Sequence, residues 1–282
     1  MTRTIPFLLP LLLLCCRSTP VDKPARTPKK GLTEKRASQR RGPIEFCGKT
    51  WPLDTTLLKC SRPNVRDLSP LSKLTQLREL DLDSIKATDY TPLRTLSNLQ
   101  ELWLAGSKIV DLTPLTSLTQ LEQLWLHQTA VHDLSPISNL TNLKKLGLVK
   151  TQVRVLAPLS GLTQLTRLDL NDTRVEDLSA LRQLSKLRNL GLSGTKVRDL
   201  SALRNLTQLD ELYLRNTPVK DLSPLRKLTS LVWVDLDNTA IRDLSALKGH
   251  TRLARLSLRN TKVSKSQVTV LRKLLPKLEL LQ

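Results

Sequence analysis

The sequence predicts an α/β solenoid of about eleven coils, with a curved parallel sheet on the concave side and short helical or 3-10 turns on the convex side. Two observations predict this fold class. The 282 residues include 66 leucines but only eight Phe, Trp and Tyr residues, and the leucines recur with a period of 22 residues. Such a period is typical of stacked coils. Nine successive repeats, without an insertion or deletion, begin at Leu77, Leu99, Leu121, Leu143, Leu165, Leu187, Leu209, Leu231 and Leu253.

The first half of each repeat predicts one strand. The repeat reads L-x-x-L-x-L-x-x-T-x-V-x-D-L-S/T-P/A-L-x-x-L-T/S-x. Its L-x-L core alternates with a period of two, so the leucines face the interior and the variable residues face solvent. Neighbouring coils then pair their strands into a parallel sheet. The register extends to residues 55–65 before the first repeat and to Leu275, Leu278 and Leu280 after the last.

The second half of each repeat predicts the return across the convex side. Its Val and Leu residues, such as Val131 and Leu134, must be buried between coils, because one coil cannot bury its own apolar face. Ser or Thr followed by Pro, as in Ser135-Pro136, is typical of an N-cap and the first position of a short helical turn. We interpret the recurring Asp, such as Asp111, as part of the turn.

This pattern resembles the leucine-rich-repeat family, and its length and D-L-S-P-L segment are similar to the internalin-type subclass of bacterial surface proteins. The resemblance covers about residues 47–282 and implies the solenoid fold. The family usually has Asn at one turn position, where most repeats of this chain have Thr. A Thr hydroxyl can also bond to the turn backbone, but more weakly. Ile85, at this position in the first repeat, has no hydroxyl, so we expect its coil to be less regular. Ser107 holds this position in the second repeat, and Thr holds it in the others: Thr129, Thr151, Thr173, Thr195, Thr217, Thr239 and Thr261.

The N-terminal end of the solenoid must be covered, because it exposes an apolar layer and an open strand edge. Residues 47–66 are predicted to form this cap. An exported chain permits a Cys47–Cys60 disulfide, and closing that segment contributes about 3 kcal/mol. Two free buried thiols are the alternative.

The repeats occupy residues 67–264, and residues 265–282 are predicted to cap the other end with a helix and a last strand. Val268, Leu271 and Leu274 stand at helical spacing there.

Residues 1–16 have the build of a secretory signal peptide, with Arg3 before a short apolar run. The run is too short to span a bilayer comfortably. Its end, LLLLCCRS, resembles a bacterial lipoprotein signal, which implies a lipid anchor on Cys16, or else on Cys15. The residue before the cysteine departs from the Gly, Ala or Ser usual in that signal. Two alternatives are cleavage near Ser18 without a lipid, and no signal.

Residues 17–46 are predicted to be a disordered basic linker. Residues 17–43 carry a formal charge of +7 and four Pro, with almost no large apolar side chains. We interpret the segment as a solvated tether. The alternatives are attraction to anionic lipid headgroups, at about 1 kcal/mol for each basic residue, and binding of nucleic acid or a nuclear import receptor.

Composition and motifs exclude several classes of protein. A hydrophobic content of 39% excludes wholesale disorder, and four Cys are too few for a disulfide scaffold. The sequence contains no phosphate-loop, nucleophile or paired acid/base motif. His127, His132 and His250 have no neighbours at the spacing of a metal site or a catalytic triad. We therefore predict no enzyme, catalytic residue, metal, cofactor or small-molecule substrate. His250 replaces a repeat Leu and is interpreted as a partly buried packing residue.

Deviations from the repeat predict a binding surface on the concave side. Four of the eight aromatic residues fall in its three outward strand columns, and exposed Trp and Tyr are common interface anchors. The alternative is that aromatic residues simply suit strands. Between two clusters, Gly147 and Gly191 are expected to leave a flatter, nearly bare stretch. The predicted protein-binding residues are Glu101, Trp103, Trp125 and His127 in the first cluster, and Tyr213, Arg215, Trp233, Asp235 and Asp237 in the second.

Charge argues against nucleic acid as the partner. The chain carries a formal +20, but the three concave columns hold eight acids and five bases, whereas a nucleic-acid reader interleaves aromatic residues with positive charge. The basic excess lies in flank columns such as those of Lys196 and Arg198. We predict a non-catalytic, exported, lipid-anchored protein of the cell envelope or surface, otherwise secreted, that binds a protein partner. The alternatives are a structural envelope protein that binds anionic lipid or polymer through its basic flank and tether, and a cytosolic regulatory adaptor.

Overall fold

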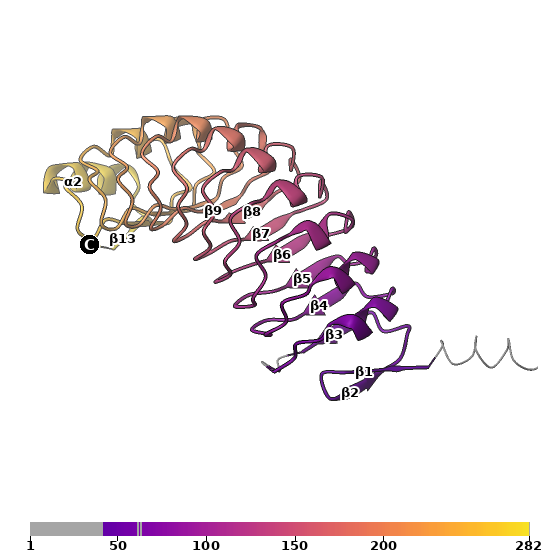
Figure 1. Ribbon diagram of the computed structural model, residues 1–282. Coiled ribbons are helices and arrows are strands. Elements are labelled where there is room, and N and C mark those ends of the chain that lie inside the picture. Colours follow the sequence, from indigo (N-terminus) through magenta and orange to yellow (C-terminus); the bar gives the residue numbers. More distant parts are fainter. Residues whose placement is uncertain (1–41, 61, 63, 282) are drawn as a thin grey trace, which may run out of the picture. The chain divides into compact units, whose positions relative to one another are not determined.

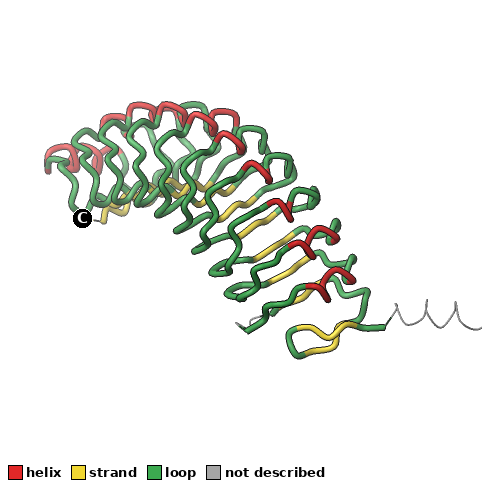
Figure 2. The backbone as a smooth tube through the Cα atoms, viewed as in Figure 1, coloured by secondary structure: helices red, strands yellow, loops and turns green. Residues whose placement is uncertain are grey.

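The computed structural model describes residues 42–60, 62 and 64–281, which belong to one compact unit. The predicted signal peptide, Cys16 and most of the predicted linker lie outside the described residues. The described residues form an 11-stranded parallel sheet and a two-stranded hairpin. Within this unit the strands line the inner side of an arc and the short helical turns line its outer side (Figure 1 and Figure 2). The predicted solenoid is confirmed.

The strands are three residues long, and each has a central Leu or Val that packs into the core. Their register is the one that the repeat predicts, since Leu58 pairs with Leu80 and Leu80 with Leu102. The eleven strands are β3 (Leu57–Lys59), β4 (Glu79–Asp81), β5 (Glu101–Trp103), β6 (Gln123–Trp125), β7 (Lys145–Gly147), β8 (Arg167–Asp169), β9 (Asn189–Gly191), β10 (Glu211–Tyr213), β11 (Trp233–Asp235), β12 (Arg255–Ser257) and β13 (Glu279–Leu281).

The convex side consists of 3-10 turns, and the predicted Ser N-cap is wrong. In η4 (Ser135–Ile137) the cap residue is Leu134, and Ser135 is already the first residue of the turn. The Ser135 backbone N–H donates to Asp133 Oδ1 at 2.9 Å, so the recurring Asp serves the turn, as predicted. The other turns are η1 (Ser69–Lys73), η2 (Thr91–Thr95), η3 (Thr113–Leu115), η5 (Ala157–Leu159), η6 (Ser179–Gln183), η7 (Ser201–Leu203), η8 (Ser223–Lys227) and η9 (Ser245–Leu247).

The Thr residues of the repeat are bonded to the turn that precedes them, and all are buried except Thr261, which is half-buried. Thr151 Oγ1, for example, donates to the Leu148 carbonyl at 2.7 Å. Ile85 has no hydroxyl, and its backbone N–H lies 3.5 Å from the Leu82 carbonyl, compared with 3.2 Å for Thr151. The first full coil is therefore less tightly bonded at this point, as expected.

One column of the turn between sheet and convex side has a left-handed backbone, which the sequence analysis missed. Gly and Asn adopt this conformation easily, whereas long side chains such as those of Gln128 and Lys150 adopt it at an energetic cost. The signal was present, because Gly or Asn occupies the column in five coils. The residues with positive φ in this column are Ser84, Gly106, Gln128, Lys150, Asp172, Gly194, Asn216, Asn238 and Asn260.

The N-terminal cap is an antiparallel hairpin of β1 (Ile44–Phe46) and β2 (Lys49–Trp51). Its two-residue loop, Cys47-Gly48, has φ of 56° and 69°, as a type I′ turn requires. Cys47 is bonded to Cys60, which confirms the predicted disulfide. The hairpin begins inside the predicted linker, because Ile44 and Phe46 are buried against the first coils.

The C-terminal cap contains the helix α2 (Lys265–Leu274), as predicted, with Val268 and Leu271 buried. Leu274, the third of the apolar residues at helical spacing, is 50% exposed. The last strand is displaced from its predicted register, since Leu280 rather than Leu278 pairs with Leu256. A ten-residue α-helix in place of a 3-10 turn adds two residues to this coil.

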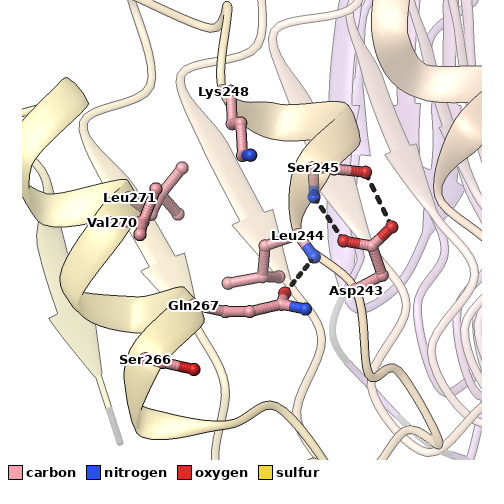
Figure 3. A pocket seen from close by; sticks show the side chains of 8 residues that line it. All are labelled: Asp243, Leu244, Ser245, Lys248, Ser266, Gln267, Val270 and Leu271. Atoms are coloured by element: carbon pink, nitrogen blue, oxygen red, sulfur yellow. Dashed lines mark hydrogen bonds between the residues drawn. The ribbon is translucent and has the colours of Figure 1, made fainter.

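A hollow of about 150 Å³ marks the seam between η9 and α2 (Figure 3). Gln267 Oε1 accepts the Leu244 backbone N–H at 2.7 Å. Asp243 accepts the Ser245 backbone N–H and hydroxyl at 2.8 and 2.7 Å. The Gln267 bond attaches the cap to the last regular coil, whereas the Asp243 bonds lie within that coil.

Candidate binding surface

The structure brings the predicted binding residues together in two clusters on the concave sheet. Glu101 and Trp103 lie on β5, and Trp125 lies on β6. His127 comes two residues after Trp125, and the two rings are neighbours. The second cluster is carried by β10, β11 and the residues that follow them. It contains Tyr213, Arg215, Trp233, Asp235 and Asp237.

The first cluster is a pair of neighbouring tryptophans beside a histidine. Trp103 and Trp125 hold the same position on adjacent strands. The Trp125 and His127 ring centroids lie 5.4 Å apart with a tilt of 41°. The Arg167 guanidinium lies 5.9 Å from the Trp125 ring, within the range of cation–π attraction. Both tryptophans are half-buried, so part of each ring is exposed.

Gly147 is covered by these rings rather than bare. A Cβ at Gly147 would lie 2.4 Å from the Trp125 ring and 2.3 Å from the His127 ring. Likewise, a Cβ at Gly191 would lie 2.6 Å from Asp169 Oδ1. The expectation of a bare stretch was wrong, because each glycine makes room for the side chains of the preceding coil.

His127 also has a structural role that the sequence analysis missed. Its Nδ1 accepts the Val149 backbone N–H at 3.1 Å, which leaves the ring proton on Nε2. Burial lowers the pKa of His127. The same link between successive coils is made at 2.7 Å from Ala105 N to Asp83 Oδ1, at 2.8 Å from Ser193 N to Asn171 Oδ1, and at 2.8 Å from Arg259 N to Asp237 Oδ1.

Asp237 is 4% exposed and therefore offers little to a partner. Its Oδ1 also accepts the Ser257 hydroxyl at 2.5 Å. Burial raises the pKa of the adjacent Asp235, whose Oδ1 accepts the Asp237 backbone N–H at 3.0 Å. We leave Asp237 out of the candidate interface and keep Asp235 at its edge.

The second cluster is a layered stack of aromatic and basic groups. The Tyr213 and Trp233 centroids are 4.8 Å apart at an interplanar angle of 72°, an edge-to-face arrangement. The Arg255 guanidinium lies 4.3 Å from the Trp233 ring. The Tyr213 hydroxyl donates to Glu211 Oε2 at 2.9 Å. Burial is the main cause that raises the pKa of Tyr213, and this hydrogen bond is the second. Arg255 was missed, although it holds the same strand position as Trp233 one coil later.

A polar hollow of about 170 Å³ lies between the two clusters, over Gly191. Arg167 and Asp169 approach each other at 3.8 Å on one side of it. Donors and acceptors of both charges surround the hollow, so it can take a polar side chain of a partner. Its polar lining consists of Arg167, Asp169, Asn171, Asn189, Glu211 and Tyr213.

Neither a metal site nor a membrane-spanning helix is seen in the described part of the chain. Residues 42–60, 62 and 64–281 contain no group of three or more His, Cys, Asp and Glu side chains that could hold a metal ion. Among the helices that the structure describes, none has both the length and the apolar character needed to cross a bilayer.

Comparisons with known proteins agree with this architecture. The family model described as "Leucine Rich repeats (2 copies)" matches residues 97–139, 141–183, 163–205, 185–227 and 207–249. No curated protein matches the chain.

Solved structures of bacterial proteins are also similar to the chain. The internalin InlF of Listeria monocytogenes is 26% identical, with 83% of each chain covered and a TM-score of 0.68. A leucine-rich-repeat protein of Leptospira interrogans is 28% identical over 79% of this chain and 60% of its own, with a TM-score of 0.73. Internalin C2 of L. monocytogenes is 28% identical over 74% of this chain and 84% of its own, with a TM-score of 0.59.

Proposed function

We propose that this chain, which belongs to the leucine-rich-repeat family, is an exported, lipid-anchored protein that binds a protein partner through its concave face and catalyses no reaction. The observation that carries the proposal is the immobilised Trp125 ring over Gly147. An aromatic side chain that is already fixed loses little conformational entropy on binding, so its contact area contributes efficiently to affinity. Such anchors dominate the energetics of protein interfaces.

The surroundings of the anchors favour a partner with basic or hydrogen-bonding side chains. Glu101 of the first cluster and its neighbours Glu79 and Asp81 are acidic, and burial raises the pKa of Glu101. A basic side chain of a partner would relieve the repulsion among them. The polar hollow over Gly191 offers Asp169 and Glu211 for the same purpose.

Export and anchoring rest on separate support. The leader of residues 1–16 ends in a cysteine pair that resembles a lipoprotein signal. The Cys47–Cys60 disulfide suits an oxidising compartment. Similarity to internalins agrees with the proposal.

The partner-binding proposal is tested by using the chain as bait among envelope and extracellular proteins. The double substitution Trp103→Ala and Trp125→Ala should abolish capture of the partner while far-UV circular dichroism shows that the chain keeps the wild-type fold. The control Val110→Ala with Val155→Ala removes exposed apolar surface elsewhere and should leave capture unchanged. Intrinsic fluorescence gives a direct readout, because three of the four tryptophans lie on the concave face. Unchanged capture by the double Trp variant contradicts the proposal.

The mature N-terminus is tested by mass spectrometry. We expect a chain that begins at Cys16 and carries acyl groups. A chain with an intact leader and reduced Cys47 and Cys60 would instead support the cytosolic alternative.

A further inference from the structure

Basic charge is concentrated in the C-terminal coils and away from the concave face. Residues 44–142 carry a net −2, whereas residues 143–282 carry 26 Lys and Arg against 12 Asp and Glu, a net +14. The concave columns of residues 143–282 contribute five bases and four acids, only +1 of that total. The convex side and the flanks of these coils therefore hold nearly all of the excess.

A row of basic side chains follows the convex side of these coils. Arg182, Arg204, Arg226 and Lys248 occupy the same repeat position, one in each coil, and all four are exposed. Arg182 and Arg226 lie within η6 and η8, whereas Arg204 and Lys248 directly follow η7 and η9. In the three preceding coils the position holds Thr116, Ser138 and Ser160. Among the residues that the structure describes, the salt bridges involve none of the three arginines of the row.

Two hollows connect the arginines of the row. The first, of about 610 Å³, is lined by Arg182, Arg204 and polar neighbours such as Asn205. The second, of about 280 Å³, is lined by Arg204, Arg226 and Lys227. No carboxylate lines either hollow, and both share Arg204. The hollows therefore form a continuous basic track across three coils.

The Asp column of the repeat runs beside the track without occupying it. Ser201 donates its hydroxyl and its backbone N–H to Asp199 at 2.7 and 2.8 Å. These two bonds lower the pKa of the Asp199 carboxyl more than the nearby Arg182 and Arg204 do. Among the described residues, no salt bridge joins these carboxylates to Arg182, Arg204 or Arg226, so the guanidinium groups keep their N–H donors for a ligand. Guanidinium groups bind phosphate, sulfate and carboxylate through paired hydrogen bonds.

We propose that this convex track binds a linear polyanion, a polymer that carries repeated phosphate, sulfate or carboxylate groups and no bases. Aromatic side chains on which bases could stack are absent from the lining of both hollows, which argues against single-stranded nucleic acid. A planar membrane touches a convex arc only near one point, whereas a flexible polymer can follow three or four coils (Figure 2). This inference is independent of the concave-face proposal.

The test compares two triple charge reversals in the full chain. The track variant is Arg182→Glu, Arg204→Glu and Arg226→Glu. The control variant is Arg154→Glu, Arg198→Glu and Lys220→Glu, which changes the net charge equally on a flank column. Both sets are exposed, and both variants keep the basic segment of residues 17–43. Affinities for sodium polyphosphate and for heparin are measured from low to physiological salt.

We expect the track variant to bind at least about tenfold more weakly than the control at low salt. The slope of its log affinity against log salt should also be less steep than that of the wild type, by about three. Near-UV circular dichroism checks that both variants fold. Equal losses in the two variants would show an effect of net charge alone and overturn the proposal. Failure of the wild type to bind either polymer, or tighter binding to phosphatidylglycerol vesicles that depends on the track, would overturn it as well.

Discussion

His127 Nδ1 accepts the backbone N–H of Val149, 3.1 Å away on the next coil. Asn171 Oδ1 takes the same part toward Ser193. One side chain thus supports the aromatic cluster and links two coils at the same time. The candidate interface and the stability of the stack are therefore coupled at this residue.

Replacing His127 should separate these two roles. His127→Ala removes the acceptor and leaves a half-buried N–H unpaired, so the free energy of unfolding should fall by about 1 kcal/mol. His127→Asn restores the acceptor used by Asn171 and should lose less than half of that amount. Urea denaturation measures both. If Asn and Ala destabilise equally, the hydrogen bond to Val149 is not what stabilises this position.

Stability should depend on pH through His127 and His250. His250 is fully buried rather than partly buried as predicted, and its Nε2 lies 3.1 Å from the Leu225 carbonyl. Burial lowers the pKa of both histidines. The unfolded chain therefore binds protons first as the pH falls below about 6.5, and the free energy of unfolding decreases from there downward.

The variant His127→Asn with His250→Leu should show a flatter profile between pH 7.5 and pH 5. At the position of His250 the other repeats have Leu. His132→Asn, at an exposed site, is the control and should retain the wild-type profile. A wild-type profile in the double variant would mean that other groups cause the acid sensitivity.

Adding a methyl group at Gly147 should displace the aromatic anchor. The new Cβ of Gly147→Ala overlaps the Trp125 and His127 rings, and overpacking of this kind costs about 1–3 kcal/mol. Tryptophan emission should shift as the indole moves into solvent. Gly161→Ala is the matched control, because no atom lies within 4 Å of its Cβ. An unchanged emission spectrum in Gly147→Ala would contradict the described packing.

Relieving the backbone at Lys150 should stabilise the protein. Lys150 has φ of 57°, in the column where Asn216, Asn238 and Asn260 stand. Because Asn adopts this conformation more easily than Lys, Lys150→Asn should raise the free energy of unfolding by roughly 1 kcal/mol. Lys108→Asn, on the flank, should have almost no effect. Equal changes in the two variants would point to charge rather than to backbone conformation.

Period and register were predictable because they depend on leucines that every coil repeats. Leu58 and Leu80 align as expected, whereas Leu280 does not, since the longer α2 breaks the period that the prediction relied on. The Cys47–Cys60 disulfide was predictable from the expected export of the chain and from the positions of the two residues at the N-terminal end of the solenoid.

The contacts of the surface residues were less predictable, because side chains of one coil bond to or cover residues of the next. The alternation of a strand assigns Asp237 to the solvent side, but only the adjoining coil shows that Ser257 and Arg259 occupy its oxygen. A glycine in an outward column reads as an empty space, yet the side chains of Trp125 and His127 fill it. The convex arginines went unnoticed because no single repeat shows that Arg182, Arg204 and Arg226 adjoin shared hollows.

The two aromatic clusters lie on one continuous sheet and are joined through the coils between them. Each coil contacts mainly its neighbours, so a small change of angle at every step accumulates along the stack. A partner that grips both Trp125 and Trp233 must hold the intervening coils at one curvature. Binding at the two ends would then stiffen the arc against bending, and a mechanical pull along the chain would weaken that grip by straightening it.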